Sequence, residues 1–480
     1  MTDQGGTADN APGYAAFKNR DDLDTYGDNA LLLFVAQMRL GFDDVDSFAS
    51  NSLTDGSNDK KCDLVAVSAD RQRIILAQGY MSERLPGGGA PANKASDLNR
   101  LFRIQGVTSG GAGWRIKFAH RTFQWDSEAP GKAAVHCVII GFTRDRAKKR
   151  RLWDYLTARS EPLEATGVRS INAYLVDGPE ILVGKRTTPL APDLPMVDYR
   201  SKPADGGNLI ITPEDYDTVM ADPVMAPYVR PYVGSKELLS DRKRWCLWLP
   251  EMDSSAPARS PELKRRLEGV AAMREASSAA STRDWARFPR LFRQTGLVSD
   301  VPFVGIPEVS SENRYYLPVS HLEPEVIISN KVYGAVDPNG IVFAVASSSM
   351  FWTWMKTVGG RMKSDPSFSS TITWNNFPMP ALTSEQRAAL ASAGAKILDA
   401  RDQHPGRSLE DHYTPLSMTP ELVRAHDQLD TVMDKIIGAP RRCRTILERQ
   451  ELLFASYVRM TSNVSAAPRA GLVPQPILAG

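Results

Sequence analysis

The stretch Ala133-Ala-Val-His-Cys-Val-Ile-Ile-Gly141 decides how the middle of this 480-residue chain folds. It is an almost continuous apolar run of strand length, which is typical of a strand buried on both faces. A second short run with strand character lies at residues 115–118. At roughly 150 residues per domain, the chain has room for about three domains around this pair of strands.

On the N-terminal side, residues 63–67 and 73–77 form two short apolar runs separated by the polar turn Ser68-Ala-Asp-Arg-Gln72. This pattern predicts a β-hairpin. Residues 29–42 are rich in apolar residues and favour a helix. Residues 1–13 are polar, and we expect them to form a disordered tail.

On the C-terminal side, residues 146–380 mix short apolar runs with Pro- and Gly-rich turns. Residues 384–401 are amphipathic and predict a helix with Ser384 as its N-cap. Residues 420–437 and 444–460 predict two more helices, and a tail begins at residue 462. The sequence therefore predicts a mixed α/β fold that ends in a helical bundle.

The composition indicates a soluble globular protein, with 42% hydrophobic and 24% charged residues. We expect a cytoplasmic protein with no membrane partner, because no apolar run approaches the roughly 20 residues of a membrane span and the N-terminus has no apolar signal core. The four cysteines are far apart and form no metal-ligand pattern, which fits a reducing compartment. A net charge of +2 neither supports nor excludes DNA binding, because phosphates sense local charge.

From residue 115 to about residue 460, ordered blocks of sequence resemble the MmeI-like (type IIG/IIL) restriction-modification DNA methyltransferases, which combine restriction and adenine methylation in one chain. The blocks are Phe118-Ala-His-Arg-Thr-Phe-Gln-Trp125, Ile171-Asn-Ala-Tyr-Leu-Val-Asp-Gly178, Ser201-Lys-Pro-Ala-Asp-Gly-Gly-Asn208, Tyr228-Val-Arg-Pro-Tyr-Val-Gly234, Arg244-Trp-Cys-Leu-Trp-Leu249 and Thr373-Trp-Asn-Asn-Phe-Pro378. The resemblance implies the end of a methyltransferase domain at 104–150, an α+β target-recognition domain at 151–380, a C-terminal helical domain at 381–461 and a tail at 462–480. It also implies double-stranded DNA as the partner.

The motifs for methyl transfer are missing. An adenine methyltransferase needs a Gly-rich strand-to-helix turn for S-adenosylmethionine and an (Asn/Asp)-Pro-Pro-(Tyr/Phe) loop for the flipped base. Asp365-Pro-Ser-Phe368 is the nearest match to the loop but lies far downstream, and residues 87–89 and 110–113 do not follow a suitable strand. We therefore predict remnant methyltransferase strands without a catalytic core. S-adenosylmethionine is the cofactor of the parent family, and we expect no cofactor to be retained here.

Residues 59–67 and 74–80 resemble the core hairpin of PD-(D/E)xK nucleases, as in abortive-infection phage-resistance proteins, within an N-terminal domain at 14–103 that is cut short. That chemistry places Mg²⁺ between two acidic or amide side chains and uses a lysine to orient water. Asp63 takes the metal-binding position and Gln78 the second, whereas Tyr80 stands where lysine is expected. The alternatives are a degenerate nuclease fold without activity, weak Mg²⁺-dependent cleavage, and an unrelated hairpin.

Two pairs of residues are candidates for base reading. Lys363 and Asp365 are one residue apart, so in an extended segment they face the same side and read one G·C pair through guanine O6/N7 and cytosine N4. Glu308 and Asn330 each follow an apolar run, at 304–307 and 326–329, and suit cytosine N4 and adenine N6/N7. The resemblance implies that both positions vary with the base read. The alternatives are an exposed charge pair, and a loop Glu with a turn Asn.

Nearby basic residues are candidates for phosphate contacts. They are Arg314, Lys331, Lys356 and Arg361. The densest basic run lies at residues 144–151, where a DNA contact and a solvated linker are equally compatible with the sequence.

Three functions are consistent with this organisation. The first is sequence-specific DNA binding by the recognition domain alone. The second is an Mg²⁺-dependent defence endonuclease, which requires a competent site at Asp63. The third is a specificity subunit for a separately encoded methyltransferase, which would pack on the apolar strand at residues 133–142. A product of gene rearrangement without function is the remaining alternative.

Overall fold

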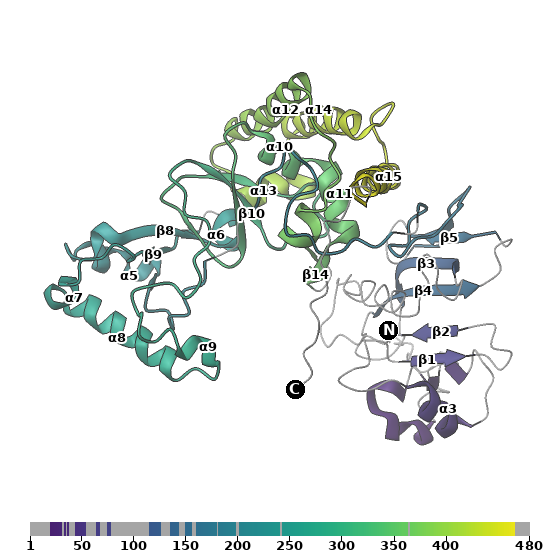
Figure 1. Cartoon of the computed structure of the whole chain (residues 1–480), viewed down its shortest axis with the longest axis horizontal. Coiled ribbons are helices and arrows are strands. Elements are labelled where there is room, and N and C mark those ends of the chain that lie inside the picture. The colour runs from purple at the N-terminus through teal and green to yellow at the C-terminus, as the bar shows by residue number, and fades with distance from the viewer. Residues whose placement is uncertain are drawn as a thin grey trace, which may run out of the picture.

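The computed structural model describes residues 20–30, 33–34, 36–37, 44–53, 64–67, 74–77, 115–125, 135–143, 149–155, 160–179, 181–197, 201–240, 242–362 and 365–465. Figure 1 shows the N-terminal strands at one end of the molecule, a lobe with α5, α7 and α8 at the other, and the C-terminal helices between them. None of the helices in these ranges combines the length and the apolar character that crossing a membrane requires.

The described N-terminal elements agree with the sequence pattern. The 3₁₀ helix η1 (Asp21–Asn29) is followed by helical residues inside the predicted helix of 29–42, and α3 (Val45–Ser52) begins after its N-cap Asp44. The strands β1 (Leu64–Val67) and β2 (Ile74–Ala77) pair antiparallel, which confirms the predicted hairpin. The nuclease candidates Asp63, Gln78 and Tyr80 lie outside the described residues, so the nuclease-like fold stays a prediction.

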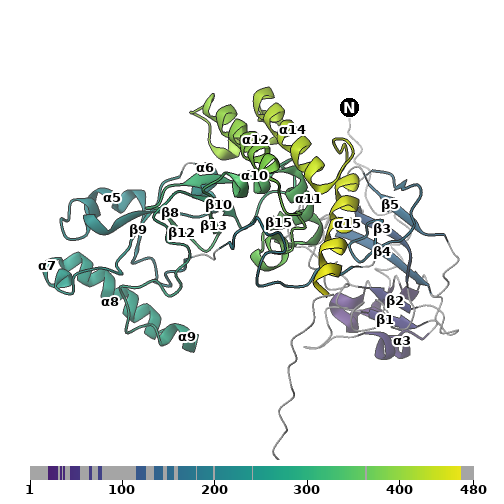
Figure 2. The same ribbon diagram turned by 45° about the horizontal axis from the view of Figure 1, so that its top comes forward.

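The next sheet has the order β4-β3-β5-β6. Its strands are β3 (Arg115–Trp125), β4 (Val135–Thr143), β5 (Arg151–Asp154) and β6 (Leu163–Glu164). The prediction of a strand buried on both faces is wrong for β4, because β4 lies at the edge of this described sheet and its residues 138–143 are half-buried. One face packs on a small core that includes Ile116, Ala119 and Leu152. Figures 1 and 2 both show the β1–β2 hairpin beside β4.

The recognition region consists of two lobes. The first lobe is built on the sheet β12-β8-β9-β7 and is covered by helices. Its elements are β7 (Ile210–Ile211), α5 (Pro213–Met220), η2 (Ala226–Tyr228), β8 (Val229–Val233), α6 (Ser235–Ser240), β9 (Trp245–Leu247), α7 (Ala256–Arg259), α8 (Pro261–Glu275), α9 (Ala280–Arg283) and β12 (Ile327–Ile328). Its core contains Leu209, Ile211 and Val270, and Arg274 at the end of α8 is fully buried.

The second lobe is built on the sheet β11-β10-β13. Its elements are β10 (Phe303–Pro307), β11 (Ser320–Leu322), β13 (Val332–Val336), α10 (Ile341–Ser347), α11 (Ser349–Val358), β14 (Gly360–Met362), β15 (Asp365–Ser367) and the π-helical turn η3 (Ser370–Trp374). All seven residues of α10 are buried, because this helix is apolar on every side and packs between the sheet and the C-terminal helices.

The C-terminal helices share one continuous core with the second lobe. They are α12 (Ser384–Asp402), α13 (Leu409–Tyr413), the short η4 (Pro415–Ser417), α14 (Pro420–Ile437) and α15 (Ile446–Ser465). The limits of α14 agree with the prediction, and α15 begins two residues later than predicted. The N-cap of α12 is Thr383 rather than Ser384, because the side chains of Thr383 and Gln386 form a reciprocal capping box.

Candidate DNA interface

The fold brings three separate segments of the second lobe together along one edge. The amide of Glu308 donates to the carbonyl of Lys331 at 2.9 Å, and the carbonyl of Glu308 accepts from the amide of Phe368 at 2.7 Å. A β-bridge between Val309 and Ser367 continues this contact. The segments around residues 308, 330 and 365 are therefore neighbours, although more than 50 residues separate the first from the last. This edge, residues 308–312, 329–331, 360–362 and 365–368, is called the reading edge below.

The first candidate pair lies at the end of β10 and in the turn before β13. The Glu308 carboxylate is 13% exposed and accepts from the Lys331 ammonium at 2.8 Å. Lys331, a candidate for phosphate contact, therefore neutralises a candidate for base reading. Such a half-exposed ion pair is worth only about 0–1 kcal/mol, so DNA can exchange its partners at little cost. Asn330 is a half-buried turn residue beside the pair.

The second candidate pair belongs to a hairpin. Met362 of β14 and Asp365 of β15 are cross-strand partners, so the chain reverses between them. The interpretation of residues 360–365 as one extended run is therefore wrong, because the rule that alternate residues share a face holds only within a single strand. Lys363 lies outside the described residues. One oxygen of Asp365 accepts from the Glu312 amide at 3.1 Å, which anchors the hairpin to the reading edge.

The other phosphate candidates are more buried than Lys331. Arg361 pairs with the Glu312 carboxylate at 3.2 Å. Arg314 is 8% exposed, and its guanidinium contacts the Ser310 hydroxyl at 3.4 Å and the Glu410 carboxylate at 3.7 Å. Burial lowers the pKa of both arginines. They stay cationic, because the pKa of a guanidinium lies far above neutral pH.

Lys356 of α11 holds its charge without a carboxylate partner in the described part of the chain. Its ammonium donates to the carbonyl of Glu312 at 2.9 Å and lies 4.7 Å from the centre of the Trp352 ring. Burial, together with the nearby charge of Arg361, lowers the pKa of Lys356 to about 8, whereas the charge of Glu312 raises it. A cation held in this way favours an anionic ligand, because a nearby anion restores the ordinary pKa.

Replacing Lys356 with methionine is expected to stabilise the free protein at pH 7 by roughly 1–2 kcal/mol. Lowering the pKa from 10.5 to about 8 costs the charged form roughly 3 kcal/mol. Methionine forfeits about 1–2 kcal/mol of hydrogen bonding and ring contact. Because the fold depresses this pKa, the cost is full below about pH 8 and disappears as the pH rises toward 10.5. Denaturant unfolding at pH 7 and pH 9.5 measures the difference.

The matched control for this prediction is Lys264→Met on α8, an exposed lysine for which we expect no change beyond about 0.5 kcal/mol. A loss of stability in Lys356→Met that is the same at both pH values would show that the ammonium is satisfied in the free protein.

Sequence reasoning missed a cluster of arginines between α14 and α15. Arg441, Arg442 and Arg444 lie within four positions, so the cluster is visible in the sequence. It follows a helix for which the sequence predicts only a structural role. A different basic run, residues 144–151, is the one that the sequence suggests as a candidate DNA contact. The structure describes only residues 149–151 of that run. There, Arg151 pairs with Glu164 at 2.8 Å and stacks on Trp153.

The sheet of β3, β4, β5 and β6 carries a group of stacked aromatic side chains. His120 stacks on Trp153 with ring centres 4.3 Å apart, and its Nδ1 lies 2.8 Å from the Tyr155 hydroxyl. Arg121 pairs with Asp154 at 2.8 Å. The described residues contain no group of His, Cys, Asp or Glu side chains suited to hold a metal ion.

Three family models match the chain in sequence order. The model described as MmeI, DNA-methyltransferase domain matches residues 107–154. The model described as MmeI, target recognition domain matches residues 177–381, and MmeI, C-terminal domain matches residues 382–465.

Individual relatives agree with these matches. DNA methyltransferase A of Bacillus subtilis (strain 168) is 33% identical over 367 residues, which is 76% of this chain and 40% of that protein. The structure of the type IIL restriction-modification enzyme MmeI in complex with DNA matches with a TM-score of 0.68 and 36% identity, over 78% of this chain and 48% of that chain. The chain thus spans less than half the length of either relative. Over residues 107–465 the chain belongs to the MmeI family.

Proposed function

We propose that this chain binds double-stranded DNA at a specific sequence through its target recognition region. The observation that carries the proposal is the reading edge, where backbone hydrogen bonds join Glu308 to Lys331 and Phe368, and the Asp365 carboxylate accepts from the Glu312 amide. Polar side chains at strand ends are well placed to reach base edges in a major groove. The similarity to MmeI, whose structure was solved with DNA, supports this partner.

Within this proposal, Lys363 and Asp365 read one G·C pair from the β14–β15 hairpin. Lysine donates to guanine O6/N7, and aspartate accepts from the cytosine N4 amine. Asp365 occupies the first position of β15. Glu308 and Asn330 specify a second pair. Lys331 and Arg361 then exchange their carboxylate partners for DNA phosphates.

The proposal includes no methyl transfer. A site for S-adenosylmethionine needs a Gly-rich turn between a strand and the helix that follows it. The described residues of the methyltransferase match belong to the strands β3, β4 and β5 and to the two residues before β5, and none of these described residues is helical. These residues do not fit the cofactor, so no step of the function is derived from it.

A specificity subunit for a separate methyltransferase is a second candidate, favoured by the position of β4. This strand lies at the edge of its described sheet, and its residues 138–143 are half-buried rather than buried. Co-expression with an adenine methyltransferase that lacks its own recognition domain tests this candidate through sequence-dependent protection of DNA from a methylation-sensitive nuclease. The endonuclease alternative depends on Asp63, Gln78 and Tyr80, and cleavage of duplex DNA with and without Mg²⁺ tests it.

Selection of bound duplexes from a random pool tests the proposed function. Wild-type protein at moderate salt is expected to enrich one motif. The variant Lys363→Glu/Asp365→Arg is expected to change one G·C position of that motif, with discrimination of about 1–3 kcal/mol at that base pair. All other positions should stay the same, because Glu308 and Asn330 are unchanged and the backbone bonds between the segments around residues 308, 331 and 368 remain.

The matched control reverses an ion pair away from the reading edge. Arg424 and Glu421 form an exposed pair on α14, so Arg424→Glu/Glu421→Arg keeps the net charge and should leave the whole motif unchanged. Failure of the wild-type protein to enrich any motif would overturn the proposed specificity. A motif that survives the Lys363/Asp365 exchange intact would overturn only the role of that pair.

A further inference from the structure

A pocket of about 720 Å³ lies between the second lobe and the C-terminal helices. Its walls come from the segment before β11, from α11 and from the connection between α14 and α15. The lining includes six cationic side chains and one carboxylate, that of the buried Asp430. The cations are Arg314, Lys356, Arg441, Arg442, Arg444 and Arg449.

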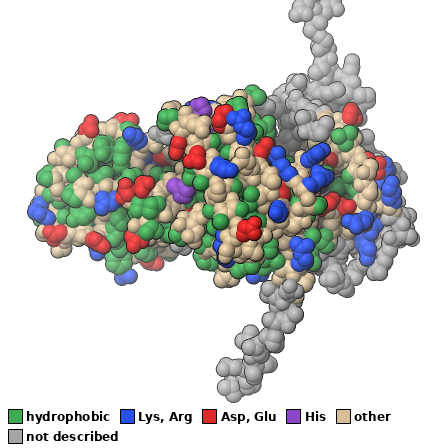
Figure 3. All heavy atoms as spheres, turned by 90° about the horizontal axis from the view of Figure 1, so that it is seen from above, with side chains coloured by type: hydrophobic (Ala, Val, Ile, Leu, Met, Phe, Trp, Pro, Cys, Tyr) green, Lys and Arg blue, Asp and Glu red, His purple; other side chains and the backbone are tan. Residues whose placement is uncertain are grey.

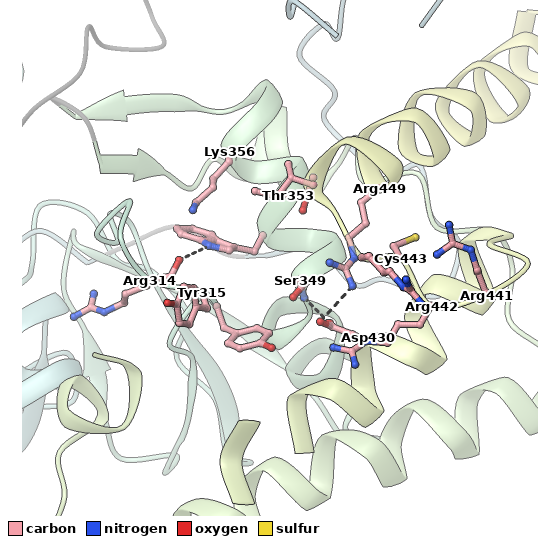
Figure 4. Close-up of a pocket in the computed structure, with 14 residues that line it drawn as sticks. Arg314, Tyr315, Ser349, Thr353, Lys356, Asp430, Arg441, Arg442, Cys443 and Arg449 are labelled. Atoms are coloured by element: carbon pink, nitrogen blue, oxygen red, sulfur yellow. Dashed lines mark hydrogen bonds and ion pairs between the residues drawn. The ribbon is translucent and has the colours of Figure 1, made fainter. Parts of the chain in front are cut away.

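The cations surround an aromatic floor. The Trp352 ring forms this floor, and its indole N–H donates to the carbonyl of Arg314 at 2.9 Å. Figure 4 shows Lys356 and Arg314 on one side of the pocket, and Arg441 and Arg442 on the other. Figure 3 looks onto the face that carries the C-terminal helices, where acidic and basic side chains both occur. The pocket is a local concentration of positive charge, because six cations and one carboxylate line it.

Some of these cations already have partners. Arg441 pairs with Glu448 at 2.8 Å, Arg442 pairs with Asp427, and Arg449 pairs with Asp434 at 2.9 Å. Two cations differ from the rest in the described part of the chain. The guanidinium of Arg444 has no ion pair or hydrogen bond, and Lys356 has only a carbonyl and an aromatic ring. A mobile anion would therefore find two cations whose charge no carboxylate offsets directly.

The pocket is continuous with the reading edge through Glu312. The carbonyl of Glu312 accepts from Lys356 inside the pocket, its carboxylate pairs with Arg361 of β14, and its amide donates to Asp365 of β15. The ammonium of Lys356 is thus two hydrogen bonds away from a candidate for base reading. On a duplex, the anions closest to bases that are being read are the phosphates of the same strands.

We propose that this pocket holds a phosphate of the DNA backbone beside the bases that the reading edge contacts, with Lys356 and Arg444 as the binding cations. The inference rests on the proposed function and adds to it a contact between the C-terminal domain and DNA. Lys356 and Arg444 donate charge-assisted hydrogen bonds to the phosphate oxygens. The contact fixes the position of the duplex but carries no base information, so it contributes to affinity and not to specificity.

The test combines Arg444→Ala with duplexes that carry one uncharged methylphosphonate linkage at a time. Arg444→Ala is expected to weaken binding roughly five- to tenfold on matched and mismatched duplexes alike, and to reduce the slope of log K against log salt by about one. One methylphosphonate position should weaken wild-type binding by at least this factor and have a smaller effect on Arg444→Ala, in which only Lys356 still contacts that phosphate. Arg424→Ala, an exposed arginine on α14 outside the pocket, is the control and should keep the wild-type slope.

The outcomes separate this inference from the proposed function. If the wild type enriches a motif but Arg444→Ala keeps its affinity and salt slope, the phosphate site is wrong and the function stands. If no motif is enriched but binding still depends on Arg444 and salt, the phosphate site stands and the specificity is wrong. If AMP or ATP stabilises the wild type but not Arg444→Ala, and DNA binding is unchanged, the pocket belongs to a free nucleotide and the inference is overturned.

Discussion

Replacing Arg274 with methionine is expected to lower the free energy of unfolding of the first lobe by about 3–5 kcal/mol. The Arg274 side chain is fully buried at the end of α8, and no carboxylate pairs with it in the described residues. Its guanidinium instead uses all five of its N–H donors on backbone carbonyls. The acceptors, at 2.7–3.1 Å, are the carbonyls of Pro203, Ala204, Trp285, Phe288 and Leu291.

The size of the effect follows from what methionine leaves behind. The carbonyls of Pro203, Trp285 and Phe288 keep a backbone amide donor, whereas those of Ala204 and Leu291 lose the donor that the structure gives them. Each unsatisfied buried group costs about 1–3 kcal/mol before relaxation. Two of the carbonyls belong to the turn before β7, where Ala204 has a φ of 49° and two glycines also adopt positive φ. Arg274 therefore also holds a conformation that a non-glycine residue avoids.

Denaturant unfolding monitored by fluorescence and circular dichroism checks this prediction. Arg274→Lys is expected to recover only part of the stability, because an ammonium has three donors and no planar fork. Arg265→Met, on the same helix but exposed and paired with Glu262, is the control and should stay within about 0.5 kcal/mol of the parent. A deficit below 1 kcal/mol in Arg274→Met would show that water replaces the guanidinium in this network.

Replacing Arg449 with methionine is expected to cost about 3–5 kcal/mol as well, for a different reason. Arg449 of α15 donates to both carboxylate oxygens of Asp434, at 2.9 and 3.1 Å, and to Asp430 at 3.4 Å. Both carboxylates lie on α14 and are at most 2% exposed. Removing the one cation leaves two negative charges buried four residues apart.

This deficit should depend on pH. Burial raises the pKa of Asp430 to about 6 even though Arg449 lowers it. A carboxyl whose pKa is raised by folding stabilises the fold most below its unfolded value, near pH 3.8, and this stabilisation is lost as the pH rises through about 6. Without Arg449 the Asp430 carboxyl takes up a proton more readily, so the deficit of Arg449→Met should be smaller at pH 5 than at pH 8.

Unfolding at these two pH values measures the effect. The triple variant Arg449→Met/Asp430→Asn/Asp434→Asn is the informative control, because neutralising the whole group removes the unpaired charges and should recover most of the stability at pH 8. An equal deficit at both pH values would contradict the electrostatic explanation and indicate lost packing instead.

The local sequence pattern was sufficient to predict elements whose limits depend on residues close to them along the chain. The limits of α14 agree with the amphipathic pattern, and the β1–β2 pair agrees with two short apolar runs around a polar turn. The prediction for α12 was wrong by one residue at its start, because the reciprocal bonds of Thr383 and Gln386 favour the earlier cap. Such bonds depend on the backbone dihedral angles at the cap. Thr383 and Ser384 are both good N-cap residues, so the sequence alone does not tell which of them has these angles.

The local sequence pattern was insufficient to predict the position and pairing of strands, which depend on residues far away along the chain. The composition of β4 indicates a strand covered on both faces, but the described sheet leaves it at an edge. The alternating residues at 360–365 suit a single strand. In the structure, however, residues 360–362 (β14) pair antiparallel with residues 365–367 (β15). In both cases the residue types indicate how apolar the surroundings of the strand should be. They do not indicate which other strand lies next to it.

The sequence by itself determined the order of the parts, the helices of the C-terminal domain and the residue types available for contact with DNA. These depend on periodicity and on local chemistry, which are readable within a few turns of chain. Only the tertiary structure decided that Glu308, Lys331 and Asp365 share one edge, and that Lys356 and Arg444 line one pocket. The physical reason is that long-range backbone pairing and burial, rather than spacing along the chain, determine which charges face each other and which are left without a partner.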